Sequence, residues 1–472
     1  MKKYDLLKVL GISLLITFFL SWVIPAGTFS SGSFVSSEAT NPLGLYDLFK
    51  IPVYVINRFV QYVLLFLAIG GFYGVLNKSG VYSKIVEDVV GKYKTKRKTF
   101  LIISIVLFSL LSSVLGLSNV ILILVPFFVT VLLKLEFSKI NSLAATIGAM
   151  LVGQIGSLIG LGTWGYLTII FSQLDSNFSM FSMILVRLVF FAIITFLYVL
   201  LVSKNTDKKE KNSIPLYSDY KTKKSTLPMI VVFSIMFILL VLGLYNLSYT
   251  FDITFLEDFH SSLIETEIGG YALFSNLIGS GSALGLWGVY DVITILIIFS
   301  IIIAWLYNVK MKDFIEGFIS GMKEMLKPAI YATLACVVFE VILNLGGTDF
   351  VNTIVNKLAG ENFTMLGTTF ATLVSSLFYN DFYTLIATMA NPFSTFDANV
   401  MQIIAFTFQV MFGLVMLIAP TSIFLLAGLS YLEISYKEWV KYIYKYVLIV
   451  FGIFIWIAIM INVIIPFISN LI

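Results

Sequence analysis

Residues 110–119 read LLSSVLGLSN, an apolar run that ends in glycine and polar side chains and then resumes as a second apolar run before Pro126. Residues 373–381, LVSSLFYND, repeat this pattern and resume toward an Asn-Pro pair. In hydrocarbon every backbone amide needs a partner, so an interrupted helix persists only inside protein or beside a water-filled cavity. The two stretches therefore predict re-entrant hairpins near 110–126 and 373–392.

A second pair of interruptions follows the two hairpins. Residues 153–163, GQIGSLIGLGT, and residues 413–422, GLVMLIAPTS, are apolar segments broken by glycine or proline. Matched breaks in two halves of a chain point to the binding site of a secondary transporter. The leading spans of the two halves start on opposite sides of the membrane, so we expect two inverted-topology repeats.

The composition places these features in a membrane. Of 472 residues, 59% are hydrophobic and 12% charged, whereas a soluble domain is about half apolar and a quarter charged. This excludes a soluble or disordered chain, and the long apolar runs exclude an outer-membrane barrel. One cysteine and one histidine argue against a disulfide or a His-based metal site, and a net charge of +4 does not indicate a nucleic-acid partner. We predict an all-α polytopic membrane protein.

The charge pattern predicts the topology. Residues 84–98, 204–224 and 310–327 are rich in lysine, which marks cytoplasmic loops. Residues 28–48 and 248–270 carry acidic groups and neither lysine nor arginine, so we expect them outside. This order puts the N-terminus inside and the C-terminus outside a cytoplasmic (plasma) membrane.

Two amphipathic stretches, 314–326 and 436–446, are expected to lie along the membrane surface. Together with the charged loops and the predicted hairpins, they divide the chain into five parts. The predicted parts are an N-terminal span with an external segment (1–58), a first inverted repeat (59–203), a solvated cytoplasmic Lys-rich linker (204–226), connecting spans with the acidic external loop and an interfacial helix (227–326), and a second inverted repeat (327–472).

Several motifs resemble one transporter family. Residues 22–29 (WVIPAGTF), 69–75 (IGGFYGV), 313–322 (DFIEGFISGM) and 420–429 (PTSIFLLAGL) resemble YfcC-type carriers. These belong to the C4-dicarboxylate anaerobic carriers and arginine/ornithine exchangers of the ion transporter superfamily. The resemblance implies a scaffold domain, a transport domain, a homodimer and an elevator-like motion.

Hydroxyl and amide oxygens gather at the predicted breaks. With freed carbonyls they suit a hard monovalent cation, and the pair Ser118-Asn119 resembles the hairpin motif of sodium-coupled carboxylate carriers. We therefore expect no cofactor apart from candidate sodium ions, with a proton as the alternative coupling ion, and each hydroxyl could instead bond its own helix. The candidate cation ligands are Ser118, Asn119, Thr163, Asn380 and Thr421, and with Asp381 and Ser422 they are also the candidate solute-binding residues.

Asp381 is the one carboxylate at either predicted tip. An ionisable group at membrane depth is costly and indicates function. It could neutralise a substrate ammonium, ligate a cation or carry a proton, unless the tip is simply solvated. Glu340, on an apolar stretch, is the second candidate proton carrier.

The function that fits these features is ion-coupled or exchange transport of a small carboxylate-bearing solute. The ammonium partner offered by Asp381 favours an amino acid, with a C4-dicarboxylate as the alternative. The sequence has no catalytic constellation of the kind that a membrane enzyme needs. It also has no charge rings and no carbonyl filter motif, which argues against a channel. The sequence also lacks a P-loop for direct ATP drive.

Overall fold

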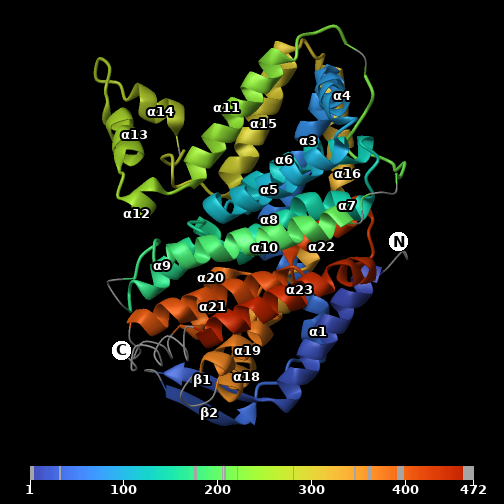
Figure 1. Cartoon of the computed structure of the whole chain (residues 1–472). Helices are drawn as coiled ribbons and strands as arrows, with labels where there is room; N and C mark the ends of the chain where they lie inside the picture. The colour runs from blue at the N-terminus through green and yellow to red at the C-terminus, as the bar shows by residue number, and fades with distance from the viewer. Residues whose placement is uncertain are drawn as a thin grey trace, which may run out of the picture.

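A computed structural model gives the fold. It describes residues 5–30, 33–174, 178–204, 206, 209–220, 222–279, 281–344, 347–359, 364–390 and 398–460. Within these ranges, eight helices are long and apolar enough to cross a membrane. The predicted all-α polytopic membrane protein is confirmed, and the termini of the described chain lie at opposite ends of the bundle (Figure 1).

The first half of the chain runs from a single span to the end of α10. It contains α1 (Asp5–Val23), β1 (Pro25–Ser30), β2 (Ser33–Thr40), α2 (Leu45–Arg58), α3 (Val60–Ser79), α4 (Val81–Tyr93), α5 (Arg97–Leu115), α6 (Ser118–Lys134), α7 (Lys139–Leu143), the π-helix η1 (Ala144–Gly148), α8 (Ala149–Ile155), the π-helix η2 (Leu161–Gly165), α9 (Tyr166–Phe171) and α10 (Ile184–Lys204). The β1–β2 hairpin is antiparallel and packs on α18, where Thr353 Oγ1 donates to the Pro25 carbonyl at 2.8 Å.

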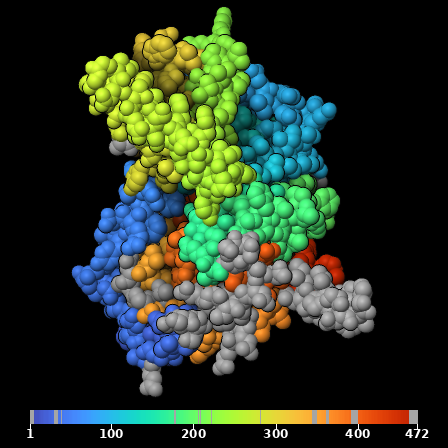
Figure 2. All heavy atoms as spheres, turned by 90° about the vertical axis from the view of Figure 1, so that its left-hand side faces the viewer, coloured from blue at the N-terminus to red at the C-terminus, as the bar shows by residue number. Residues whose placement is uncertain are grey.

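The second half begins with an arm of two long helices that carries the acidic segment at its end. It contains α11 (Leu227–Leu244), α12 (Leu247–Phe251), α13 (Phe255–Glu265), α14 (Leu273–Ile278), α15 (Val289–Leu306), α16 (Met311–Leu334), α17 (Val337–Asn344), α18 (Gly347–Ala359), α19 (Met365–Ser375), α20 (Phe382–Met389), α21 (Ala398–Met416), α22 (Ile423–Leu432) and α23 (Tyr436–Ile459). Figure 2 shows the yellow-green arm at the surface beside the green of α9 and α10.

Helices α3 and α16 pack backbone against backbone. A Cβ atom on Gly74 would lie 1.9 Å from the Gly317 carbonyl oxygen, and one on Gly70 would lie 2.3 Å from that of Gly321. Small residues at four-residue spacing permit such an approach between membrane helices. The stretch 314–326, expected at the membrane surface, therefore packs one face against α3, while Ile315, Ile319 and Leu326 on its other side stay exposed.

Helix α16 also runs through the predicted boundary at 326–327. Pro328 lies inside the helix, since a proline removes one hydrogen bond without necessarily ending a helix that neighbours support. The break comes later, between Leu334 and Val337, so the boundary drawn from the sequence does not coincide with an element boundary. The other expected surface stretch, 436–446, forms the first turns of the continuous α23.

All four predicted helix interruptions are present. Two residues, Gly116 and Leu117, join α5 to α6, and six residues join α19 to α20. Helix α8 ends at Ile155 before η2 begins, and α21 ends before α22. The limbs of the first hairpin are whole helices of 19 and 17 residues, longer than the predicted 110–126, with Pro126 inside α6. Residues 391–392 of the second predicted hairpin lie outside the described residues.

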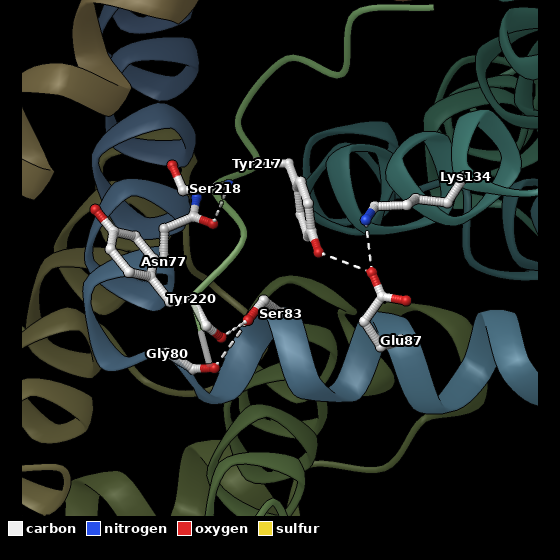
Figure 3. Close-up of polar contacts among 8 residues, drawn as sticks. All are labelled: Asn77, Gly80, Ser83, Glu87, Lys134, Tyr217, Ser218 and Tyr220. Atoms are coloured by element: carbon white, nitrogen blue, oxygen red, sulfur yellow. Dashed lines mark hydrogen bonds and ion pairs between the residues drawn. The ribbon is translucent and has the colours of Figure 1, made fainter. Parts of the chain in front are cut away.

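The linker at 204–226 is exposed over much of its described length, as expected of a solvated segment, but its backbone is also docked onto the helices (Figure 3). The Asn77 side chain donates to the Leu216 carbonyl at 2.9 Å and accepts from the Ser218 amide at 3.0 Å. Ser83 Oγ donates to the Tyr220 carbonyl. Polar groups at the α3–α4 turn need partners when they are buried, and the linker backbone supplies them.

A carboxylate on α4 extends this docking toward the first hairpin. Glu87 accepts from Lys134 Nζ at 2.5 Å and from the Tyr217 hydroxyl at 3.2 Å (Figure 3). Nearby, Lys209 forms an ion pair with Glu136 at 2.9 Å, and its hydrogen bond lowers the pKa of that carboxyl. The linker thus contacts both the α3–α4 unit and the end of α6.

The three lysine-rich segments meet at one end of the protein. Lys84 Nζ donates to the Lys224 carbonyl at 3.1 Å, which joins the first segment to the linker. The Leu216 amide donates to Glu324 at 2.5 Å, which joins the linker to the third. The acidic segment follows the opposite end of α11. This arrangement agrees with the charge pattern in the sequence.

Candidate functional site

The tips of both hairpins line one cavity of about 510 Å³. Ser118 and Asn119 come from the start of α6, and Asn380 and Asp381 come from the turn before α20. Ser422, at the start of α22, lines it as well. The sequence predicted two separate clusters, and the structure brings their members to a single chamber.

Two predicted residues lie just outside the cavity lining. Thr163 is buried, and its hydroxyl donates to Ser157 Oγ within the break that follows α8. Thr421 is also buried, and its hydroxyl has no hydrogen-bond partner in the described chain. Thr163 therefore supports the backbone of the break, whereas Thr421 keeps an unused oxygen beside the start of α22.

The two asparagines at the tips carry buried atoms without hydrogen bonds. Asn119 Oδ1 and both polar side-chain atoms of Asn380 are inaccessible to solvent and unpartnered within the described ranges. Ser118 Oγ, next to Asn119, accepts from Gln154 Nε2 at 2.8 Å. Buried polar atoms are nearly always paired, so these atoms are available to bind a water, an ion or a solute. Amide and hydroxyl oxygens are ligands that fit a sodium ion.

Asp381 is the N-cap of α20. Its Oδ2 atom accepts from the Thr384 amide at 2.8 Å and from the Thr384 hydroxyl at 2.6 Å. An N-cap carboxylate satisfies an amide that has no partner inside its helix. One oxygen of Asp381 is thus engaged in holding the helix, and the residue is half-buried at the cavity wall.

Glu340 lies away from the cavity lining and forms an ion pair. Arg58 Nε lies 3.1 Å from Glu340 Oε2, and the Glu340 side chain is 2% exposed while that of Arg58 is 45% exposed. The pair joins the end of α2 to α17. This places Glu340 in a structural contact between helices, and it does not share the chamber with Asp381.

Four helices of eight or more residues begin at the cavity. Their N-cap residues Leu117, Gly288, Asp381 and Ser422 all line it. Helix N-termini present free amides and a positive dipole end, which favour anions. Among the described residues that line the cavity, Asp381 is the one charged side chain. Asp291 and Asp381 already cap α15 and α20, so the uncapped N-termini of α6 and α22, rather than lysine or arginine, are available to bind a carboxylate.

The break after α8 is held by residues from both halves of the chain. Ser113 Oγ donates to the Gly156 carbonyl at 2.7 Å, and Gln409 Nε2 donates to the carbonyls of Ile155 at 2.8 Å and Ser157 at 3.1 Å. The turn at Gly116, with φ of 67°, fits against this break. The freed carbonyls are thus paired by side chains from α5 and α21.

Sequence reasoning missed the two glutamines that shape the site, Gln154 and Gln409. Gln154 lines the cavity and bonds the first tip, and Gln409 holds the break beneath it. The available signal was an amide side chain on an otherwise apolar helix, which is costly in a membrane unless it has partners. Rings of Tyr62, Tyr166 and Trp287 complete the wall.

The cavity lies at the end of the protein that carries the acidic segment. Its lining includes Leu244, Asn246 and Tyr249 at the end of α11, and Trp287 just before α15. The Trp287 ring packs on Gly243, where a Cβ atom would lie 2.1 Å from it. The arm formed by α11 and α15 therefore closes one side of the cavity.

Comparison with known proteins places this site in a family context. The chain matches the profile of the C4-dicarboxylate anaerobic carrier family over residues 5–464. A search of curated proteins finds no match. Two solved structures are similar to this chain. The YdaH transporter of Alcanivorax borkumensis has 16% identity over 97% of both chains and a TM-score of 0.39. MtrF of Neisseria gonorrhoeae has 11% identity over 97% of this chain and 94% of its own, and a TM-score of 0.38.

The family match spans nearly the whole chain and includes both hairpin tips. It confirms the resemblance noted in the sequence and excludes the enzyme alternative. The chain belongs to the C4-dicarboxylate anaerobic carrier family, and it is a multi-pass membrane transporter.

Proposed function

We propose that this transporter moves a small carboxylate-bearing solute, most simply an amino acid, through the cavity between the two hairpin tips. The observation that carries the proposal is the charge arrangement of the cavity. The N-termini of α6 and α22, which have no capping carboxylate, can receive a carboxylate, while the single charged side chain of the lining, Asp381, can receive an ammonium group.

A C4-dicarboxylate is the second candidate, and the family description favours it. Two carboxylates would find amides at the helix N-termini, but they would also meet the charge of Asp381. Like charges in one small site repel strongly, so this solute requires a bound cation or a proton on Asp381. The two candidates therefore differ in the number of cations that must accompany the solute.

Sodium coupling is part of the proposal. The unpartnered oxygens of Asn119, Asn380 and Thr421 support it, with Ser118 and Ser422 nearby at the cavity wall. If the coupling ion is a proton, we propose Asp381 as its carrier. Glu340 is the second candidate, because its ion pair with Arg58 gives it a structural role. Symport and exchange are both compatible with these residues.

The proposed transport cycle is of the elevator type, in a homodimer with the N-terminus inside the cytoplasmic membrane and the C-terminus outside. Helices α3, α15 and α16 pack tightly together and would form the scaffold, and the two hairpins with their broken helices would form the moving domain. The two matched pairs of interruptions support inverted repeats. The acidic end of the arm beside the cavity supports an outward orientation of this state.

Uptake into proteoliposomes tests the solute and the coupling ion together. Labelled amino acids and C4-dicarboxylates would be offered with an imposed sodium gradient, a proton gradient or neither. We expect gradient-driven or exchange uptake of one amino acid class, competed by its unlabelled form. Uptake of dicarboxylates alone would overturn the amino acid proposal, and the absence of any uptake or counterflow would contradict the site itself.

A further inference from the structure

A second, larger hollow lies between α10 and α23 at the lysine-rich end of the protein. Its volume is about 1390 Å³, and it shares no lining residue with the cavity at the hairpin tips. Tyr198 of α10 and Tyr446 of α23 lie in edge-to-face contact at 5.0 Å, and the Tyr446 hydroxyl donates to the Ile194 carbonyl at 3.1 Å. These contacts join the two helices, which run side by side in Figure 1, and Tyr446 also lines the groove.

Lysines dominate the charged rim of this groove. Five lysines and three glutamates line it, which leaves a net charge of +2. Glu433 is paired with Lys139 at 3.3 Å, and Glu438 accepts from the Ser435 amide and hydroxyl at the start of α23. The lining lysines are Lys98, Lys139, Lys204, Lys441 and Lys445.

Three of these lysines have no carboxylate partner within the described chain. Lys204 ends α10, and Lys441 and Lys445 lie one turn apart on α23, all three exposed. The opposite face of α23 is buried, with Trp439 donating to the Leu417 carbonyl at 2.8 Å. The four-residue spacing of lysine on α23 therefore points positive charge into the groove while the aromatic face anchors the helix.

The inner wall of the groove is apolar and open. It is lined by Leu197, Leu200 and Leu201 of α10 and by Ile449 of α23. Leu200 is 47% exposed and Ile449 is 51% exposed. Both residues belong to helices that are long and apolar enough to cross a membrane, so this wall suits contact with lipid hydrocarbon. A water-soluble anion would leave these side chains uncovered.

We propose that the groove between α10 and α23 binds an anionic phospholipid of the cytoplasmic leaflet. The phosphate-bearing headgroup lies among Lys204, Lys441 and Lys445, and the acyl chains lie against the leucines of α10 and Ile449. Basic pockets between membrane helices on the cytoplasmic side bind such headgroups, and lysines near the surface attract anionic lipids. Tyr442 and Tyr444, which also line the groove, are of a residue type enriched at membrane interfaces.

Lipid binding to purified protein tests the proposal. The full-length transporter would be delipidated in mild detergent and titrated with phosphatidylglycerol or phosphatidylcholine, with adducts counted by native mass spectrometry. We expect phosphatidylglycerol to be retained preferentially. The K204Q/K441Q/K445Q variant should bind it roughly 100-fold more weakly, at about fivefold for each lysine removed. The matched control K92Q/K94Q/K310Q removes three exposed lysines outside the groove and should bind as wild type.

A measurement on the unaltered protein covers the case in which the triple variant fails to fold. A photoactivatable phosphatidylglycerol should label peptides from the ends of α10 and α23. Equal loss of affinity in the two triple variants, equal retention of both lipids, or labelling elsewhere would overturn the proposal. Complete competition by glycerol phosphate would assign the groove to a soluble anion, and cross-linking of the groove to a second copy of the chain would assign it to a dimer contact, so either result also overturns it.

Discussion

The replacement Gln409→Met tests how the chain stabilises the break beneath the cavity. In the wild-type protein the Gln409 amide pairs two carbonyls, those of Ile155 and Ser157, and the residue is 1% exposed. Methionine keeps the unbranched shape and nearly the volume, so packing changes little. Loss of the Gln409 amide leaves the carbonyls of Ile155 and Ser157 without this donor, at a cost of about 1–3 kcal/mol for each carbonyl.

Part of this cost is offset in the variant. Gln409 Oε1 has no partner among the described residues, so removing it relieves one unsatisfied buried atom. The net decrease in the free energy of unfolding should therefore be about 1–3 kcal/mol. Unfolding by SDS titrated into mild detergent micelles, followed by tryptophan fluorescence, measures it.

Thr407→Val is the matched control on the same helix. The Thr407 hydroxyl donates to the Ile403 carbonyl of its own helix at 2.8 Å, so its loss should cost less than about 1 kcal/mol. If Gln409→Met and Thr407→Val both unfold at the wild-type SDS fraction, then Gln409 does not hold the break.

Three further replacements test other contacts. Gly74→Ala places a Cβ atom 1.9 Å from a carbonyl oxygen of α16 and should destabilise the protein by about 1–3 kcal/mol. Unfolding at the wild-type SDS fraction would contradict this and would mean that α3 and α16 can move apart freely. Asn77→Ala removes two hydrogen bonds to the linker, so trypsin should cut the linker faster than in the wild-type protein. An unchanged cleavage rate would mean that Asn77 does not hold the linker. Arg58→Met removes one ion pair of the buried Glu340 and should destabilise the protein by about 1–3 kcal/mol. Adding Glu340→Gln should recover part of this loss, and no recovery would rule out coupling between the two groups.

The helix interruptions could be predicted because they leave a local trace in the sequence. Glycine and polar residues at 116–119 cannot continue a lipid-facing helix without partners, and the structure places a left-handed turn at Gly116. The polar tips Asn119 and Asn380 followed from the same rule. The local sequence was therefore enough to locate the positions at which the helices are interrupted.

The partners of those atoms could not be predicted from local sequence. Gln409 bonds Ile155 across 254 positions, and no spacing rule links them. The same holds for the convergence of the two tips in one cavity, which depends on how the halves pack. The boundary at 326–327 was misplaced because α16 continues through Pro328 to Leu334. The docked linker was missed because its contacts are made largely by backbone atoms, which composition does not reveal.

The measurement that tests the solute site most directly is transport by Asp381→Asn. Asparagine is as good an N-cap as aspartate, so α20 should keep its start and the protein its yield and unfolding behaviour. Asp381→Ala, which loses the cap as well, controls for the structural role at a cost of about 1 kcal/mol. We predict that Asp381→Asn folds as wild type but shows no uptake in proteoliposomes. Uptake at the wild-type rate would show that Asp381 takes no part in transport and would contradict this account of the cavity.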